Sequence, residues 1–323
     1  MSKAPDESVM HLRRITAGYT ASRILLTASN LRVFDCLEKP ATAKNVAKWH
    51  SLDERATEIL LDALVALEFL KKSGSKYRNT KTASTLLVRG KPYYQGDILA
   101  HHDVLWDGWS KLDEVVSTGK PAPRGRSHES FIKGMHNLSV LRADKVVSSL
   151  DLKGVKKVLD LGGGPGTYAI EFAKRGIDAY LFDLDETYSI ARDIISSVKV
   201  KGKIEFIPGD FIVDEIGRGY DMVLISQIFH AYGEKTNIKV LKKVNKALNK
   251  GGRVVVQEFL VNDDRTSPRP GALFAVNMLV GTTEGRTFSP KEMTAWLKKA
   301  GFGSVKRSFF EDNVVLEAKK KAL

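Results

Sequence analysis

The sequence predicts an α/β protein with a mostly parallel sheet, preceded by a mainly helical N-terminal region. Three observations support this fold class. From residue 155 onward, apolar segments of strand length alternate with segments of helical periodicity, as in a parallel sheet wrapped by helices. The last two apolar segments, 305–310 and 314–318, flank a short Glu-Asp-Asn turn and predict an antiparallel hairpin. The first third of the chain carries apolar residues at three- and four-residue spacing, which indicates helices.

The composition is that of an ordinary globular protein. The chain has 323 residues, of which 43% are hydrophobic and 28% charged. These values exclude a disordered or collagen-like chain, and the length favours two domains. We expect a first domain over residues 1–91, linking helices over 92–150 and the α/β domain over 151–323.

The sequence also predicts a cytoplasmic protein. Cys36 is the only cysteine, so a disulfide within the chain is excluded, as suits a reducing compartment. The segment Met1–Val9 is charged and lacks the apolar stretch of a secretion signal. The longest apolar stretch, Ile59–Leu67, is interrupted by Asp62 and is too short to cross a membrane. We therefore expect no membrane partner.

The first domain follows the order of a winged helix. Thr42 is placed to cap a short helix that runs through Trp49. Ser51 and Glu54 form a capping-box pattern ahead of a second helix. Two short strands around a Ser-Gly turn then follow within Phe69–Asn79. Helix, helix and hairpin in this order predict a winged helix.

Charge argues against DNA as the partner of this domain. The net charge of +13 is spread over both halves of the chain. Between Ser51 and Leu70, five acidic side chains face a single base, Arg55. DNA phosphates would repel such a helix. The pattern therefore favours packing or dimerisation, and a DNA-binding regulator remains the alternative.

The second half predicts five parallel strands, three intervening helices and a closing helix. The strands are Val155–Leu161, Ala179–Asp183, Ile204–Pro208, Met222–Ser226 and Arg253–Leu260. The intervening helices are 167–175, 187–198 and 235–249. Ser289 and Glu292 form a capping box at the start of the closing helix, and Gly301 is placed to end it.

A glycine-rich turn over Val158–Thr167 predicts a nucleotide site. Its second part fits the pattern G-x-G-x-x-A of dinucleotide-binding proteins. The whole segment fits the pattern D-x-G-x-G-x-G of adenosylmethionine-binding proteins, formed by Asp160, Gly162, Gly164 and Gly166. A fixed carboxylate disfavours a pyrophosphate and can meet a cationic amino group, directly or through water. Asp160 therefore favours adenosylmethionine, while the glycines alone leave both interpretations open.

Two further carboxylates follow the next two strands. Asp183 ends the second strand, where a carboxylate can accept both ribose hydroxyls. Asp210 follows the third strand, where it can take the adenine amino group while Phe211 covers the ring. Either aspartate alone could be a cap or a turn residue. Because carboxyl ends of parallel strands share one edge, we expect these residues and Ser226, at the end of the fourth strand, to bind the cofactor.

His230 follows the fourth strand on the same edge and is a candidate base. A hydroxyl that accepts a methyl group must lose its proton. A phenol has a pKa of about 10, so a neutral imidazole, with a pKa of about 6.5, is a useful base for its proton at the transition state. Position alone favours a structural or capping histidine over a catalytic one.

With these motifs the sequence resembles the small-molecule O-methyltransferases of the plant caffeate type and their bacterial relatives. The resemblance covers nearly the whole chain and is strongest over Val158–Leu260. It implies the Rossmann-like sheet of class I methyltransferases and an N-terminal winged-helix dimerisation domain. It also implies S-adenosylmethionine as cofactor, S-adenosylhomocysteine as product, no metal and a homodimer.

The resemblance places the catalytic residues at His230, Glu258 and Glu284. It assigns His230 as the base and the two glutamates as groups that orient the imidazole. The chain departs from the family pattern in two places. The family's His-Asp-Trp reads His230 followed by Ala231–Tyr232, and Gly285 shifts Glu284 by one residue against the following Arg-Thr pair.

The resemblance also suggests the methyl acceptor and its contacts. It implies a small aromatic or conjugated molecule bearing a hydroxyl, with a nitrogen, sulfur or carbon acceptor as the alternative. The residues expected near the acceptor are Trp106, Trp109, Phe274, Met278 and Leu279. Taken singly, Trp106, Trp109, Met278 and Leu279 fit the hydrophobic core better than a pocket. A His-His-Asp run at 101–103 lacks a fourth ligand at a recognisable spacing, so we expect no metal.

Overall fold

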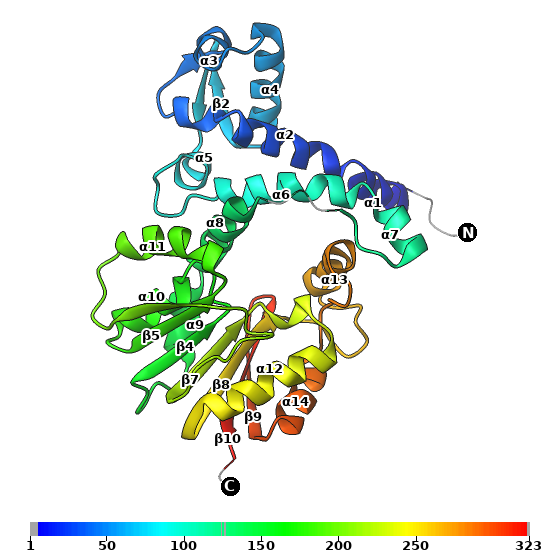
Figure 1. Cartoon of the computed structure of the whole chain (residues 1–323). Coiled ribbons are helices and arrows are strands. Elements are labelled where there is room, and N and C mark those ends of the chain that lie inside the picture. The colour runs from blue at the N-terminus through cyan, green and yellow to red at the C-terminus, as the bar shows by residue number, and fades with distance from the viewer. Residues whose placement is uncertain (1–5, 124, 126, 322–323) are drawn as a thin grey trace. The chain divides into compact units, whose positions relative to one another are not determined.

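The structure is a computed structural model that describes residues 6–123, 125 and 127–321. Two compact units make up the chain (Figure 1). The division between them lies between Asp103 and Val104. The division falls inside helix α6 (Gly96–Trp109). None of the described helices is long and apolar enough to span a membrane.

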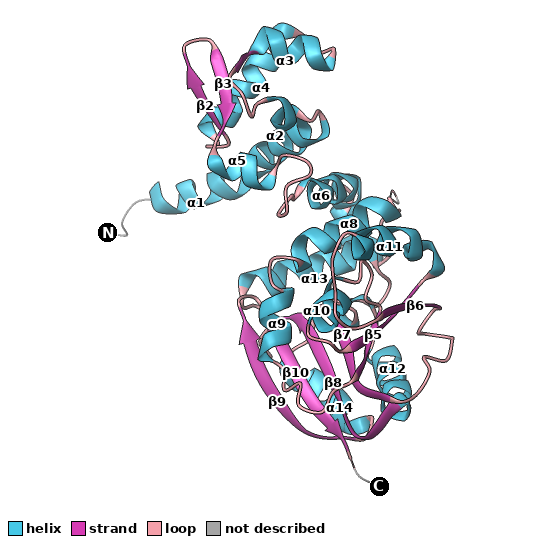
Figure 2. Cartoon of the chain, turned by 90° about the vertical axis from the view of Figure 1, so that its left-hand side faces the viewer, coloured by secondary structure: helices cyan, strands magenta, loops and turns pink. Residues whose placement is uncertain are grey.

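The first unit contains helices and a small antiparallel sheet (Figure 2). Its strands pair in the order β1-β3-β2, around a core that includes Phe34, Leu61, Leu64 and Tyr77. The elements ahead of α6 are α1 (Asp6–Thr16), α2 (Gly18–Asn30), η1 (Val33–Cys36), β1 (Ala41–Thr42), α3 (Ala43–His50), α4 (Glu54–Ala66), β2 (Leu70–Ser73), β3 (Lys76–Asn79) and α5 (Lys81–Leu86). The predicted order of helix, helix and hairpin is confirmed.

One predicted helix cap is wrong. Thr42 caps α3 as expected and forms a capping box with Asn45. Ser51, however, lies in the left-handed region at the end of α3, with φ of 55°. Asp53 caps α4 instead, because its carboxylate accepts the backbone N–H of Ala56 at 2.7 Å. The short connection needs one residue to end α3 and a different one to begin α4.

The second unit is built on a seven-stranded sheet with the order β6-β5-β4-β7-β8-β10-β9. The first five strands of this order are parallel, and β10 pairs antiparallel with both β8 and β9, as predicted. The strands are β4 (Lys157–Leu161), β5 (Asp178–Asp183), β6 (Ile204–Pro208), β7 (Tyr220–Ser226), β8 (Leu248–Phe259), β9 (Phe302–Phe310) and β10 (Asn313–Lys320).

Helices cover both faces of this sheet (Figure 1). Val158 of β4 packs with Phe172 of α10 on one face, while the next residue, Leu159, belongs to the core with Trp296 of α14 on the other. This alternation is the two-residue period of a strand buried on both sides. The helices after α6 are α7 (Leu112–Thr118), α8 (His128–Ser139), α9 (Ala143–Ser149), α10 (Thr167–Lys174), α11 (Tyr188–Ser196), α12 (Glu234–Ala247), α13 (Arg269–Gly281) and α14 (Pro290–Lys299).

The predicted limits of α14 are confirmed. Ser289 and Glu292 form its capping box, and Gly301, with φ of 90°, follows its end. The parallel order of β6, β5, β4, β7 and β8 brings the carboxyl ends of these strands to one edge of the sheet. That edge carries the candidate site.

The cap assignment in the first unit can be tested by unfolding the full chain in urea. Asp53→Ala is expected to lower the free energy of unfolding by about 1 kcal/mol, because the N–H of Ala56 loses its acceptor. Ser51→Gly is the matched control and should have little effect, since glycine adopts a positive φ without strain. A larger loss at position 51 than at position 53 would contradict the assignment.

Candidate active site

The glycine turn folds tightly over the end of β4. It joins β4 to α10, and Gly162 and Gly166 have φ values of 67° and 74°, which L side chains rarely adopt. The closest approach is at Gly163, where a Cβ atom would lie 2.5 Å from Cγ of Asp160. The turn therefore requires glycine both for its conformation and for its contact with the carboxylate below.

Asp160 lies beneath this turn, with no exposed surface. Its Oδ2 accepts the backbone N–H of Ala169 at 3.1 Å, which fixes the first turn of α10. Its Oδ1 is buried and has no hydrogen-bond partner among the described residues. Burial raises the pKa of Asp160 to about 7, and the nearby charge of Asp183 acts in the same direction. The carboxylate expected to face the cofactor thus forms the floor of the turn.

Asp183 ties the end of β5 to the glycine turn. Its Oδ2 accepts the N–H of Gly164 at 2.8 Å. Its Oδ1 accepts the N–H of Leu184 at 2.8 Å and the hydroxyl of Thr187 at 3.0 Å. The side chain is half-buried. It lies at the edge of the sheet where the parallel strands end, which we call the rim, and it holds the glycine turn in place.

Aromatic rings lie on the other side of the turn. A Cβ atom on Gly162 would come within 3.3 Å of the Phe211 ring. The Tyr232 ring meets Phe211 edge to face, with centroids 5.8 Å apart. Burial raises the pKa of Tyr232, and the charges of Asp210 and Asp183 add to this shift. Asp183, Phe211 and Tyr232 therefore lie around the turn, Asp210 directly precedes Phe211, and their part in cofactor binding stays a prediction.

The Ser226 side chain at the end of β7 points to a neighbouring strand. Its hydroxyl donates to Oε1 of Gln257 in β8 at 3.2 Å. Gln257 is fully buried, and its Nε2 has no hydrogen-bond partner among the described residues.

His230 forms a buried pair with Glu258. It lies in η3 (Phe229–Ala231), directly after β7. Its Nδ1 lies 2.8 Å from Oε2 of Glu258, whose Oε1 accepts the His230 backbone N–H at 3.3 Å. The side chains are 12% and 4% exposed. An Nδ1–H that donates to this carboxylate leaves Nε2 with a free lone pair, so the pair can act as a base.

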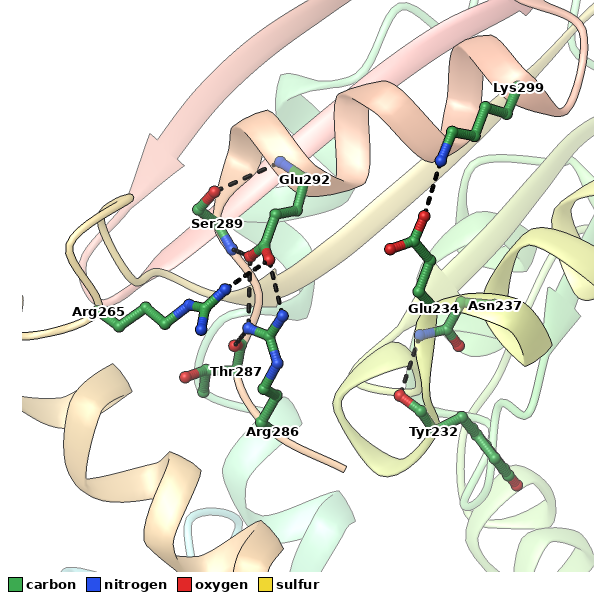
Figure 3. A network of polar contacts seen from close by, with 9 residues as sticks. All are labelled: Tyr232, Glu234, Asn237, Arg265, Arg286, Thr287, Ser289, Glu292 and Lys299. Atoms are coloured by element: carbon green, nitrogen blue, oxygen red, sulfur yellow. Dashed lines mark hydrogen bonds and ion pairs between the residues drawn. The ribbon is translucent and has the colours of Figure 1, made fainter. Parts of the chain in front are cut away.

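Asn237 fixes the turn that carries His230. It is buried in the first turn of α12, and its Nδ2 donates to the carbonyl oxygens of Phe229 at 2.9 Å and of Tyr232 at 3.2 Å. Figure 3 shows the contact with Tyr232. Asparagine in a helical first turn is common, so sequence reasoning had no signal for this role.

Glu284 does not join the histidine pair. Its side chain is exposed, and among the described residues no hydrogen bond links it to His230. Its carboxylate lies beside Gly233, where a Cβ atom would be 2.6 Å from Oε2. The next residue, Gly285, packs on the histidine turn instead, because a Cβ there would lie 2.4 Å from the His230 carbonyl oxygen.

An ion-pair network anchors the segment that contains Gly285 (Figure 3). Glu292 of α14 accepts a hydrogen bond from Arg286 at 2.7 Å and from Arg265 at 3.1 Å. It also accepts the backbone N–H of Ser289 at 2.8 Å. Glu292, which completes the capping box of α14, therefore also holds the segment that packs against the His230 backbone.

Aromatic side chains pack against the imidazole of His230. The Phe274 ring of α13 meets the imidazole edge to face at 4.9 Å, and the Phe259 ring lies 3.9 Å from that of Phe274. Met278 is buried, whereas Leu279 is 37% exposed. Of the residues expected near the methyl acceptor, Phe274 is the one that contacts His230. Phe259 is an additional aromatic neighbour that the sequence analysis does not name.

The predicted tryptophans lie along α6. Trp109 is 38% exposed, and its Nε1 donates to Oδ1 of Asn277 in α13 at 3.1 Å. Trp106 is half-buried.

Two histidines of α8 also reach the rim and were missed from the sequence. His136 Nδ1 lies 2.8 Å from the hydroxyl of Thr167, the first residue of α10. His128 Nε2 lies 3.2 Å from the hydroxyl of Thr187, which donates to Asp183. Both contacts join segments distant in sequence, so no local pattern could have revealed them.

These residues fit a nucleoside that carries a cation. The rim combines carboxylates, a glycine turn that admits close approach and a buried carboxylate oxygen that lacks a donor. Among the described residues, no three His, Cys, Asp or Glu side chains converge as metal ligands.

The comparisons with known proteins identify the family. Residues 120–303 match the model of the O-methyltransferase domain, and residues 14–89 match the O-methyltransferase dimerisation domain. The chain belongs to the S-adenosylmethionine-dependent O-methyltransferase family and is a methyltransferase. The dimerisation domain implies assembly with further copies of the chain.

Relatives align with nearly the whole chain. The 3-hydroxy-5-methyl-1-naphthoate 3-O-methyltransferase of Streptomyces sahachiroi is 34% identical, over 91% of this chain and 90% of the relative. The N,N-dimethyltransferase OxyT of Streptomyces rimosus is 27% identical, over 93% and 92%. The structure of human N-acetylserotonin methyltransferase in complex with S-adenosylmethionine shares the fold, with a TM-score of 0.90 at 24% identity, and covers 100% of both chains.

The buried Asp160 should make the stability of the cofactor-free protein depend on pH. Its folded-state pKa of about 7 exceeds the ordinary value of 3.8, so the folded state holds the proton more tightly. The free energy of unfolding should therefore fall as the pH rises from about 4 to about 7. Asp160→Asn cannot ionise, and urea unfolding across this range should give a flatter profile. Asp185→Asn, at an exposed site, should keep the wild-type slope, and an equally steep profile for Asp160→Asn would contradict the prediction.

Proposed function

We propose that this enzyme transfers the methyl group of S-adenosylmethionine to a hydroxyl of a small aromatic or conjugated molecule, with His230 as general base. The proposal rests mainly on the His230–Glu258 pair, which lies beside Phe274. The pair is at the edge of the sheet where the strands that carry Asp160 and Asp183 end. The name of the Streptomyces sahachiroi relative, a naphthoate O-methyltransferase, supports an aromatic acceptor.

The rim residues hold the cofactor in this proposal. Asp183 accepts the ribose hydroxyls, Asp210 accepts the adenine amino group, and Phe211 covers the adenine ring. Gly162, Gly164, Gly166 and Ser226 border the amino-acid part, and Asp160 supports the turn beneath it. When bound, the sulfonium supplies an electrophilic methyl group, and S-adenosylhomocysteine is the product.

His230 removes the proton of the acceptor hydroxyl. With Nδ1–H bound to Glu258, the imidazole presents Nε2 to the hydroxyl. The Glu258 carboxylate then stabilises the imidazolium that forms, as a triad carboxylate does. Phe259 and Phe274 orient an aromatic ring beside the base, and this orientation supplies much of the rate. Glu284 is exposed and forms no hydrogen bond to His230 among the described residues, so the proposal assigns the orienting role to Glu258.

A nitrogen acceptor is the second candidate. OxyT, a relative of similar coverage, is named an N,N-dimethyltransferase. The residue after the base, Ala231, also departs from the acid of the family pattern. Methyl transfer to a phenol and to an aniline with the same ring would separate the hydroxyl acceptor from the nitrogen acceptor.

We further propose that the enzyme acts as a cytoplasmic homodimer formed through its dimerisation domain.

Cofactor binding tests the rim directly. Wild-type protein is expected to bind S-adenosylmethionine in calorimetry and to bind NAD far more weakly. Asp183→Ala should weaken binding about tenfold or more, because it removes a charged acceptor of hydroxyl donors. Asp185→Ala, at the exposed residue two positions on, is the matched control. Preferential binding of NAD would overturn the cofactor assignment.

Loss of the base should affect chemistry and spare cofactor binding. His230→Ala is expected to lower kcat for methyl transfer to a phenol by about 10²- to 10⁴-fold with unchanged cofactor affinity. The loss should shrink for a 2,4-dinitro-substituted phenol, which is already ionised at neutral pH. Glu258→Gln should show the same trend more weakly, and His11→Ala, at an exposed site, should have no effect. An equal loss for both phenols would argue that His230 only shapes the site.

A further inference from the structure

Lys243 of α12 holds the turn that follows β6 with three hydrogen bonds. Its ammonium group donates to the carbonyl oxygens of Phe211 at 3.0 Å, Ile212 at 3.1 Å and Asp214 at 2.8 Å. An ammonium group has three protons, so all of its donors are used on this one turn. Lysine side chains on helices normally extend into solvent, whereas this one is half-buried.

The turn needs these donors because its own hydrogen bonds leave three carbonyls open. The Asp210 carbonyl accepts the N–H groups of Val213 at 3.0 Å and Asp214 at 2.7 Å. The Asp210 Oδ1 accepts the N–H of Ile212 at 2.8 Å, and Asp214 Oδ2 accepts the N–H of Asp210 at 2.8 Å. No backbone N–H of the described residues reaches the carbonyls that Lys243 binds.

The turn presents Asp210 and Phe211 to the candidate cofactor site. The ring of Phe211 lies beside Gly162, and within the described part of the chain no donor reaches Oδ2 of Asp210. This oxygen is therefore free to accept a hydrogen bond from a ligand. Asp210 projects from this turn, and Lys243 binds the three carbonyl oxygens that the turn leaves open.

Helix α12 connects this turn to the catalytic histidine. Its first turn carries Asn237, which holds the segment containing His230, and Lys243 lies further along the same helix. We propose that Lys243 is a positioning residue that fixes Asp210 and so sets selectivity for a purine with a 6-amino group. This inference rests on the proposed function, in which Asp210 accepts the adenine amino group.

The test compares two ligands by calorimetry. One is S-adenosylhomocysteine, and the other is its analogue with hydrogen in place of the 6-amino group. Wild-type protein is expected to prefer the amino ligand by about tenfold, the order expected for a hydrogen bond to a charged group. In Lys243→Met this preference should fall to within about twofold, chiefly through weaker binding of the amino ligand. Lys239→Met, which changes an exposed lysine one turn earlier, should keep the wild-type preference.

The outcomes separate this inference from the proposed function. If wild-type protein binds neither ligand, or binds both equally, the proposed adenine site fails. If wild-type protein discriminates and Lys243→Met discriminates equally well, the positioning role is overturned. If Lys243→Met does not fold, Lys243→Arg decides, because a planar guanidinium keeps the charge but cannot reproduce three converging donors. Its preference should fall at least about threefold, and an unchanged preference would overturn the inference.

Discussion

The close approach of the glycine turn to the Asp160 carboxylate is the constraint on which the site depends. A single Cβ atom at Gly163 would collide with Asp160, so the turn exists only with hydrogen at that position. The same carboxylate accepts the N–H of Ala169 and thereby sets where α10 begins. Two further residues contact the turn, since Asp183 binds the backbone of Gly164 and Phe211 packs beside Gly162. Asp183 and Phe211 are therefore placed by contacts with this turn.

Burying a carboxylate without a full set of donors costs free energy and raises its pKa, and Asp160 is fully buried with one oxygen that lacks a donor among the described residues. An enzyme gains from this only if the buried group serves the bound state. A cationic amino group near the turn would favour the ionised carboxylate and recover part of the cost. In the proposed function, cofactor binding would therefore favour the ionised form of this carboxylate.

The sequence was most informative where local patterns determine structure. Apolar runs identified the parallel strands, and Ser289 with Glu292 identified the start of α14. It failed at Ser51, because two residues with capping side chains lie close together and only tertiary geometry decides which one begins the helix. Asp160 was placed at the correct end of β4, but its burial depends on how closely the turn packs over it.

The positioning residues of the site were invisible for a related reason. Asn237 and Lys243 look like ordinary polar residues of an amphipathic helix, and their partners are backbone carbonyls, which have no signature in a sequence. Phe259 and Tyr232 could equally have belonged to the core. Their roles follow from contacts between strands and helices that meet only at the shared edge of the sheet.

The two departures from the family pattern lie in contact with each other. A Cβ atom at Gly285 would be 2.4 Å from the carbonyl oxygen of His230 and 3.2 Å from the carbonyl carbon of Ala231. The segment that carries Gly285 is anchored through Arg286 to Glu292, so it cannot withdraw freely to admit a larger residue. Glu258 meanwhile supplies acceptors for both Nδ1 and the backbone N–H of His230. Glu258 of β8 therefore orients the imidazole of His230 without a carboxylate at position 231, and the small residue there lies in the close packing around Gly285.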